Sequence, residues 1–227
     1  MRSKCLTPNT VLGTAPPRKL DGGQFGKHIT YFPSRKNNNL VACESNLEAD
    51  FCLYLEYLPS FRHYISHPIQ LILSSGGRTP LKYTPDFYAL IGDGEYTFYE
   101  IKPDILMVDE KTREKMQAII RILAKEGYPL ELIGESSFRN PAITSNLNYL
   151  YGASFGSTTS GVFRVVQLIE ESSQKKLTAR QLLDTPFPPS AADIAAAIFS
   201  QKVHIDLNRF FSIDSVISSK SKNARCI

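Results

Sequence analysis

The chain has 227 residues, of which 42% are hydrophobic, and this is enough to bury the core of one large domain or of two small ones. No segment approaches the roughly 18 apolar residues of a membrane-spanning helix, and no secretory signal is visible, so we expect an intracellular, soluble protein. The four cysteines are scattered without a CxxC pair, which disfavours zinc and disulfide frameworks and fits a reducing cytoplasm.

The net charge of +4 is unevenly distributed along the chain. Residues 1–36 carry seven Lys/Arg against one acid, whereas residues 37–140 carry ten basic and fifteen acidic residues. Basic ends around an acidic middle indicate arms that meet a polyanion and a centre that gathers carboxylates. Solvated tails are the alternative interpretation of the same charges.

In chain order, residues 1–40 are rich in Pro, Gly, Asn and basic residues, and we expect an extended or poorly packed arm there. Apolar residues at helical spacing predict a helix over 44–58, which Pro59 ends. A strand over 62–77 follows. Two further strands, over 81–90 and 95–102, flank a Gly-Asp-Gly turn that is typical of a hairpin.

The next segment predicts an amphipathic helix over 109–127, which ends at a glycine and leads into a strand over 128–137. This helix would link two neighbouring strands as a right-handed crossover does. The order helix, three strands, helix, strand indicates a mixed α/β fold.

The small, polar segment 152–161 predicts a domain boundary, so that the arm (1–40) and a catalytic domain (41–151) would be followed by a C-terminal domain (152–227). In this last domain we expect three short helices and a small hairpin, which together suggest a winged-helix-like module. The helices lie within 162–172, 178–184 and 190–201, with Ser190 as N-cap, and the strands within 202–207 and 214–218.

Charged residues at the end of the hairpin predict a metal site. Glu100 and Lys102 are two apart on a strand, so both side chains point to the same face, roughly 6.6 Å apart. The hairpin would bring Asp86 close to Glu100, and two adjacent carboxylates repel unless a cation compensates them. Oxygen ligands without a paired His or Cys favour Mg²⁺, with Mn²⁺ as a substitute. Such a site would hydrolyse phosphodiesters, with Lys102 positioning the attacking water or stabilising charge at phosphorus. An edge strand with a surface Glu–Lys pair is the structural alternative.

The preceding helix offers a third carboxylate from Glu44, Glu48 or Glu56. Glu48 also fits a capping box with Ser45, a role that would need no metal. Two histidines, His63 and His67, lie four positions apart, but the prolines around them argue against a helix, so we do not expect the pair to share a metal.

A helix with an acid, then Pro85-Asp86, then Glu100-Ile101-Lys102 resembles the signature of the PD-(D/E)xK nuclease superfamily. The surrounding segments "SNLEADFCLYLEY", "HPIQL", "YTPDFYA" and "FYEIKPD" are similar to those of the TnsA-type endonucleases of heteromeric cut-and-paste transposons. The resemblance covers about residues 40–150; the C-terminal part is similar in layout only.

The resemblance implies a restriction-endonuclease-like mixed sheet flanked by helices, followed by a winged-helix-like domain, in a bacterial cytoplasmic protein. It implies Mg²⁺-dependent hydrolysis of the 5′, non-transferred strand at the transposon ends. The implied ligands are Glu48, Asp86, Glu100 and the carbonyl of Ile101, and the implied catalytic lysine is Lys102. Some family members have Gln in place of Glu100, and Glu44 is the reserve for Glu48.

The implied partners are double-stranded DNA, a TnsB-like DDE transposase, and a TnsC-like AAA+ regulator that binds the C-terminal domain. We expect Arg18, Lys19, Arg35 and Lys36 to contact DNA phosphates, although an acidic face of a partner protein would suit them equally. Two alternatives remain open: a stand-alone restriction or repair nuclease of the same superfamily, and a non-catalytic DNA-binding or adaptor module with structural carboxylates.

Overall fold

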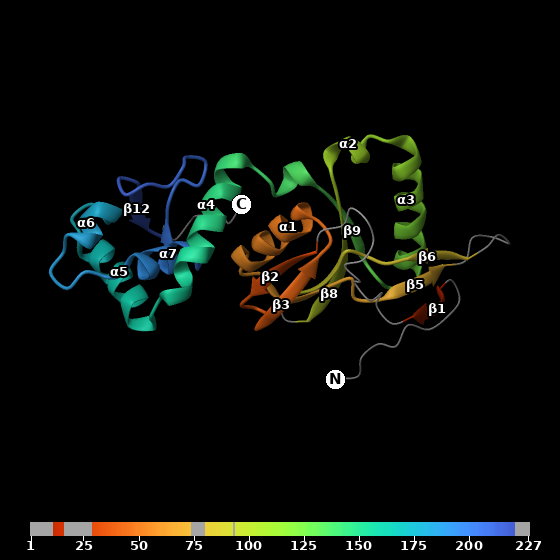
Figure 1. Cartoon of the computed structure of the whole chain (residues 1–227), viewed down its shortest axis with the longest axis horizontal. Helices are drawn as coiled ribbons and strands as arrows, with labels where there is room; N and C mark the ends of the chain where they lie inside the picture. Colours follow the sequence, from red (N-terminus) through yellow and green to blue (C-terminus); the bar gives the residue numbers. More distant parts are fainter. Residues whose placement is uncertain (1–10, 16–28, 74–79, 93, 221–227) are drawn as a thin grey trace. The chain divides into compact units, whose positions relative to one another are not determined.

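A computed structural model describes residues 11–15, 29–73, 80–92 and 94–220 of the chain (Figure 1). The chain divides into two compact units, Met1–Phe138 and Arg139–Ile227. The boundary therefore comes earlier than the segment 152–161 that the sequence indicated. The reason is the helix α4 (Pro141–Ala153), which the sequence patterns did not reveal and which belongs to the second unit.

The first unit is built on a mixed four-stranded sheet with the strand order β4-β7-β8-β9. Its strands are β4 (Phe61–Ser66), β7 (Phe87–Ile91), β8 (Glu95–Lys102) and β9 (Leu130–Gly134). Strands β4, β7 and β8 pair antiparallel, whereas β8 and β9 are parallel. The parallel pair is linked through α2 (Asp104–Met107) and α3 (Glu110–Lys125), which confirms the expected helical connection.

The expected hairpin is formed by β7 and β8, in which Ile91 pairs with Glu95 and Phe87 with Tyr99. Gly92 and Gly94 lie in its turn with φ angles of +55° and +140°, which residues with a side chain adopt at a cost. This register, continued by one residue, places Asp86 opposite Glu100.

Two of the expected strands are each divided between two sheets. The strand expected over 62–77 forms β4 and β5 (Gln70–Leu73), and the strand expected over 81–90 forms β6 (Leu81–Tyr83) and β7. Strands β5 and β6 belong to a second sheet with β1 (Val11–Ala15), in the order β1-β5-β6. The prediction of one continuous strand in each segment was wrong, because periodicity does not show where a chain leaves one sheet for another. The chain does so here at His67-Pro68 and at Pro85-Asp86.

The prediction of an extended arm over residues 1–40 is wrong for the C-terminal end of that range. There, residues 30–43 form the hairpin of β2 (Thr30–Ser34) and β3 (Asn39–Cys43). Residues 1–10 and 16–28 lie outside the described part of the chain. The helix α1 (Asn46–Tyr57) follows this hairpin and confirms the helix expected there. Its Phe51 packs against Phe87, Tyr99 and Phe138, so α1 is anchored over the main sheet.

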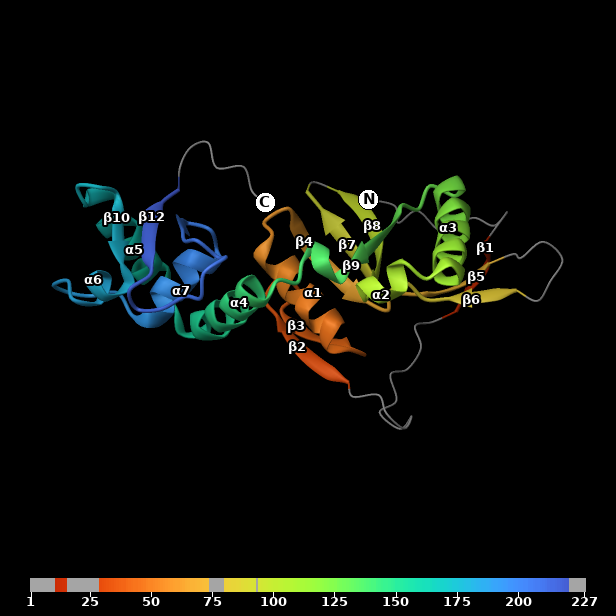
Figure 2. The ribbon, with the colours of Figure 1, turned by 90° about the horizontal axis from the view of Figure 1, so that it is seen from above.

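Helix α3 begins after the N-cap Asp109 and is followed by Gly127 with a φ angle of +78°. It buries Met116, Ile119 and Leu123 in a core that also includes residues of β5, β6, β8 and β9. In both views α3 lies beside β5 and β6 (Figure 1 and Figure 2). The second sheet and α3 thus support the end of the hairpin that carries Glu100 and Lys102.

The second unit contains all three helices that the sequence predicted, and Ser190 is the N-cap of the third, within a capping box with Asp193. Its three-stranded antiparallel sheet has the order β10-β12-β11, of which β10 was not foreseen. After α4 the elements are α5 (Thr159–Glu171), β10 (Lys176–Thr178), α6 (Ala179–Leu183), α7 (Ala191–Phe199), β11 (Val203–His204) and β12 (Val216–Ser219). Two single 3-10 turns lie at Glu135–Ser137 and Ser154–Gly156. No helix within the described ranges has both the length and the apolar character needed to cross a membrane.

Candidate metal centre

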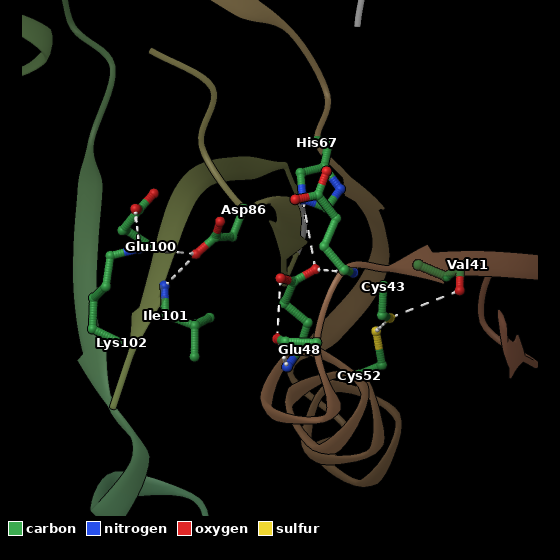
Figure 3. A network of polar contacts seen from close by, with 11 residues as sticks. Val41, Cys43, Glu48, Cys52, His67, Asp86, Glu100, Ile101 and Lys102 are labelled. Atoms are coloured by element: carbon green, nitrogen blue, oxygen red, sulfur yellow. Dashed lines mark hydrogen bonds and ion pairs between the residues drawn. The ribbon is translucent and has the colours of Figure 1, made fainter. Parts of the chain in front are cut away.

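Asp86 lies at the point where the chain passes from β6 in the second sheet to β7 in the main sheet. Its carboxylate oxygen Oδ2 accepts a hydrogen bond of 2.8 Å from the backbone amide of Ile101 (Figure 3). Its backbone carbonyl accepts a hydrogen bond of 2.8 Å from the amide of His67. Asp86 is therefore held from both neighbouring strands, with its side chain fixed next to the end of β8.

Glu100 and Lys102 share one face of β8, as their spacing predicts. Nζ of Lys102 lies 2.5 Å from Oε1 of Glu100 and 3.9 Å from Oδ2 of Asp86. Ile101 between them is turned the other way and is buried. Because the N–H and C=O of one extended residue point toward the same neighbouring strand, the carbonyl of Ile101 faces the same edge as its amide, toward Asp86.

Only one half of the expected capping box forms, because Ser45 caps the Glu48 amide while the Glu48 carboxylate accepts from the Glu44 amide and the Ser45 hydroxyl. Oγ of Ser45 accepts a hydrogen bond from the Glu48 amide and donates to Oε1 of Glu48, both at 3.1 Å. The Glu44 amide donates to Oε2 at 2.8 Å. The cap orients the buried carboxylate, and the same carboxylate belongs to a group of potential ligands with His67 and Asp86.

His67 is a residue of the site that the sequence interpretation missed. One potential ligand atom from each of Glu48, His67 and Asp86 lies within 4.8 Å of the other two. The spacing of His63 and His67 raised only the question of a site shared by the two, and His63 is an exposed residue of β4. The informative signal would have been register, because β4 and β7 pair Ser66 with Phe87 and their ladder continues to His67 and Asp86.

The other two acids of α1 are excluded as the helix ligand by their positions. Glu44 precedes the helix, and its amide supports the Glu48 carboxylate. Glu56 is buried two turns further along α1, where it accepts hydrogen bonds from Ser34 at 2.6 Å and from Tyr64 at 3.0 Å. Of the three candidates, Glu48 is thus the acid that α1 brings to Asp86.

The electrostatics of the site favour a cation. Burial, and then the charge of Glu100, raise the pKa of Asp86 to about 7, although Lys102 and the Ile101 amide oppose this shift. Burial lowers the pKa of Lys102, but the charges of Asp86 and Glu100 outweigh it and raise the pKa overall. Three carboxylates face one ammonium, so an additional positive charge would relieve their repulsion.

Tyr83 supports the site from β6. Its hydroxyl donates a hydrogen bond of 2.8 Å to Oε2 of Glu100, and burial followed by the charge of Glu100 raises the pKa of the phenol. Alternation along a strand places a tyrosine side chain on one face, but it does not reveal where the hydroxyl will end.

The four basic residues that we expect to contact DNA differ from one another in their surroundings. Nζ of Lys36 donates to the carbonyls of Leu55 and Leu58 at 2.6 Å each, and burial lowers the pKa of Lys36 to about 8. Lys36 therefore binds the C-terminal carbonyls of α1 rather than presenting a free ammonium to DNA. Arg35 is exposed, and Arg18 and Lys19 lie outside the described residues.

Compared with models of known protein families and with curated protein sequences, the chain matches none.

Proposed function

We propose that the first unit is a metal-dependent endodeoxyribonuclease of the PD-(D/E)xK type with a restriction-endonuclease-like core. The single observation that carries the proposal is the convergence of Glu48, Asp86, Glu100 and Lys102 from one helix and two adjacent strands. Each carboxylate has a hydrogen-bond donor of its own, but these donors do not neutralise its charge. Two of the three carboxylates are buried, the charges of Glu100 and Glu48 both act on Asp86, and all three act on a single lysine.

The residues fit a divalent cation. The ligand candidates are the carboxylates of Glu48, Asp86 and Glu100 and the carbonyl of Ile101, a set of oxygen donors that suits Mg²⁺ and Mn²⁺. A bound cation would act as a Lewis acid on a phosphodiester oxygen and would lower the pKa of a bound water. The raised pKa of Asp86 is what a ligand site without its cation is expected to show.

The chain's own residues would orient the reacting groups. Lys102 is held beside Glu100 and Asp86 and is partly exposed, so its ammonium can reach a phosphate oxygen or an attacking water. It would stabilise the negative charge that develops at phosphorus. Glu100 would hold Lys102 in place, and Tyr83 would hold Glu100.

We further propose that the protein is the subunit of a heteromeric transposase that cuts the 5′, non-transferred strands at transposon ends. Its partners would be double-stranded DNA, a TnsB-like DDE transposase and a TnsC-like AAA+ regulator. The support is the resemblance of the motifs around Pro85-Asp86 and Glu100-Ile101-Lys102. The second unit adds support, because its order α5, β10, α6, α7, β11, β12 is similar to that of winged-helix domains.

The test is cleavage of DNA carrying transposon ends, in Mg²⁺, with and without the transposase and the regulator. We expect Asp86→Asn to abolish cleavage of the 5′ strands and Glu95→Gln, an exposed acid of the same hairpin, to leave it unchanged. Cleavage of plain DNA by the isolated protein would indicate a stand-alone nuclease instead. Equal products from wild type and Asp86→Asn would indicate a non-catalytic module and would reject the nuclease assignment.

A further inference from the structure

We propose that the imidazole of His67 is a ligand of the metal, and that this nitrogen makes the centre prefer Mn²⁺ to Mg²⁺. The proposal deepens the function proposed above and rests on its metal site. A purely oxygen-based site would follow from Glu48, Asp86 and Glu100 alone, whereas the structure also brings a potential ligand atom of His67 within 4.8 Å of one from Glu48 and one from Asp86.

The first argument is the position of His67 in the sheet. The amide of His67 donates to the carbonyl of Asp86, so the ladder between β4 and β7 continues one residue beyond Ser66 and Phe87. On the other side of Asp86, the ladder between β7 and β8 leads to Glu100. Asp86 therefore lies between His67 and Glu100 along the sheet, and the side chains of His67 and Asp86 each offer a ligand atom to the group that includes Glu48.

The second argument is that the imidazole lacks adequate partners. His67 is only 6% exposed. Its Nδ1 has no hydrogen-bond partner among the described residues, and its Nε2 lies 3.5 Å from Oε2 of Glu48, beyond the usual length of a hydrogen bond. Leaving a buried polar nitrogen unpaired costs free energy, because its hydration is lost without a replacement. A cation between Glu48 and Asp86 would give one ring nitrogen a partner; Figure 3 shows His67 directed toward Glu48.

The third argument is the backbone of His67, which has a φ angle of +45°. Residues with a side chain adopt this left-handed conformation rarely, and it is retained when the surroundings require it. Here it occurs where the chain leaves the main sheet before Pro68, and it holds the imidazole above Glu48 instead of letting β4 continue.

The ligand chemistry then determines the metal. Mg²⁺ binds oxygen donors almost exclusively, whereas imidazole suits transition metals, and Mn²⁺ accepts both carboxylate and imidazole. A centre in which one imidazole joins the carboxylates of Glu48, Asp86 and Glu100 should therefore bind Mn²⁺ more tightly than Mg²⁺. Replacing the imidazole by an oxygen donor should remove most of this preference.

The decisive measurement is pulsed electron paramagnetic resonance of the full chain loaded with Mn²⁺, together with calorimetric titrations of Mn²⁺ and of Mg²⁺. We expect a ¹⁴N coupling in the wild type that changes to a ¹⁵N coupling when histidine is labelled with ¹⁵N. The coupling should disappear in His67→Asn, because asparagine tolerates a positive φ angle and offers only an amide. We expect the affinity of His67→Asn for Mn²⁺ to fall by about 10-fold or more, with a smaller change for Mg²⁺.

The matched control is His63→Asn, which changes an exposed histidine of the same strand and should retain the coupling and both affinities. Mn²⁺ bound without a histidine ¹⁴N coupling in the wild type, no Mn²⁺ binding at all, or a coupling retained in a folded His67→Asn would overturn the proposal. The isotope experiment needs only the wild type, so it decides the question even if His67→Asn does not fold. A histidine nitrogen coupling without DNA cleavage would reject the nuclease function but support His67 as a metal ligand. DNA cleavage without this coupling would support the nuclease function but reject His67 as a ligand.

Discussion

The hydroxyl of Tyr83 donates a hydrogen bond to one carboxylate oxygen of Glu100, while the other oxygen contacts the ammonium of Lys102. A residue of the second sheet thus determines the orientation of two residues at the end of the main sheet. The hydrogen bond is buried and its acceptor carries a charge, a combination that makes a strong hydrogen bond.

Tyr83→Phe should therefore lower both stability and activity. We expect the free energy of unfolding to fall by about 1.5–3 kcal/mol, because a buried hydrogen bond to a charged group is lost. DNA cleavage should fall as well, since Glu100 would no longer hold Lys102 in one position. Urea unfolding and the cleavage assay measure the two effects. Tyr96→Phe, at a tyrosine that is 45% exposed, should change neither quantity by a comparable amount.

Lys102→Gln should affect the chemical step more than the binding of the metal. The ammonium is expected to stabilise charge in the transition state, so the cleavage rate should fall by on the order of 10²–10³-fold. The affinity for a divalent cation should rise or stay the same, because a positive charge next to Glu100 and Asp86 is removed. Single-turnover cleavage and calorimetry separate the two. Lys82→Gln, at an exposed lysine of β6, is the control. A variant that loses metal binding but cleaves at the normal rate with excess metal would contradict this role.

The metal-free protein should lose stability as the pH rises. The pKa of Asp86 is raised from its ordinary value of 3.8 to about 7 in the folded protein, so the folded state holds a proton that the unfolded state has released. The contribution of Asp86 to stability is therefore full below about pH 4 and is lost as the pH rises to about 7.

Urea unfolding in the presence of a chelator, compared between wild type and Asp86→Asn, measures this contribution. We expect the fall in stability between pH 5 and pH 7 to be smaller in Asp86→Asn, which has no group to titrate at this position. For the same reason, the affinity of the wild type for a divalent cation should weaken below about pH 7, because the cation must displace the proton. Parallel stability curves for the two proteins would show that Asp86 is already ionised.

Lys36→Met should destabilise the protein without changing the salt dependence of DNA binding. The variant removes two hydrogen bonds to the carbonyls of Leu55 and Leu58, and we expect a loss of about 1–3 kcal/mol in the free energy of unfolding. If Lys36 instead contacts a phosphate, the slope of log K against log salt should decrease by about one unit. Binding titrations at several salt concentrations distinguish the two roles.

Some of the site follows from local sequence alone. Side chains alternate along a strand, so the spacing of Glu100 and Lys102 places them on one face wherever the strand lies. The N-cap role of Ser45 follows equally, because Ser45 and Glu48 interact within one turn of α1. The hairpin turn with Gly92 and Gly94, and helix α3 with its cap and its terminal glycine, are local features of the same kind.

The remaining features depend on contacts between residues far apart in the chain. His67 and Tyr83 reach the site because two continuous β patterns divide between sheets, and no local rule states where a strand changes sheet. Lys36 binds the end of α1, about twenty residues later, for the same reason. The sequence by itself determined which side chains share a face and which acids and lysine could form a site, because periodicity and capping act over a few residues. Only the tertiary structure decided that an imidazole and a phenol join them, because strand register and sheet exchange are set by packing across the whole unit.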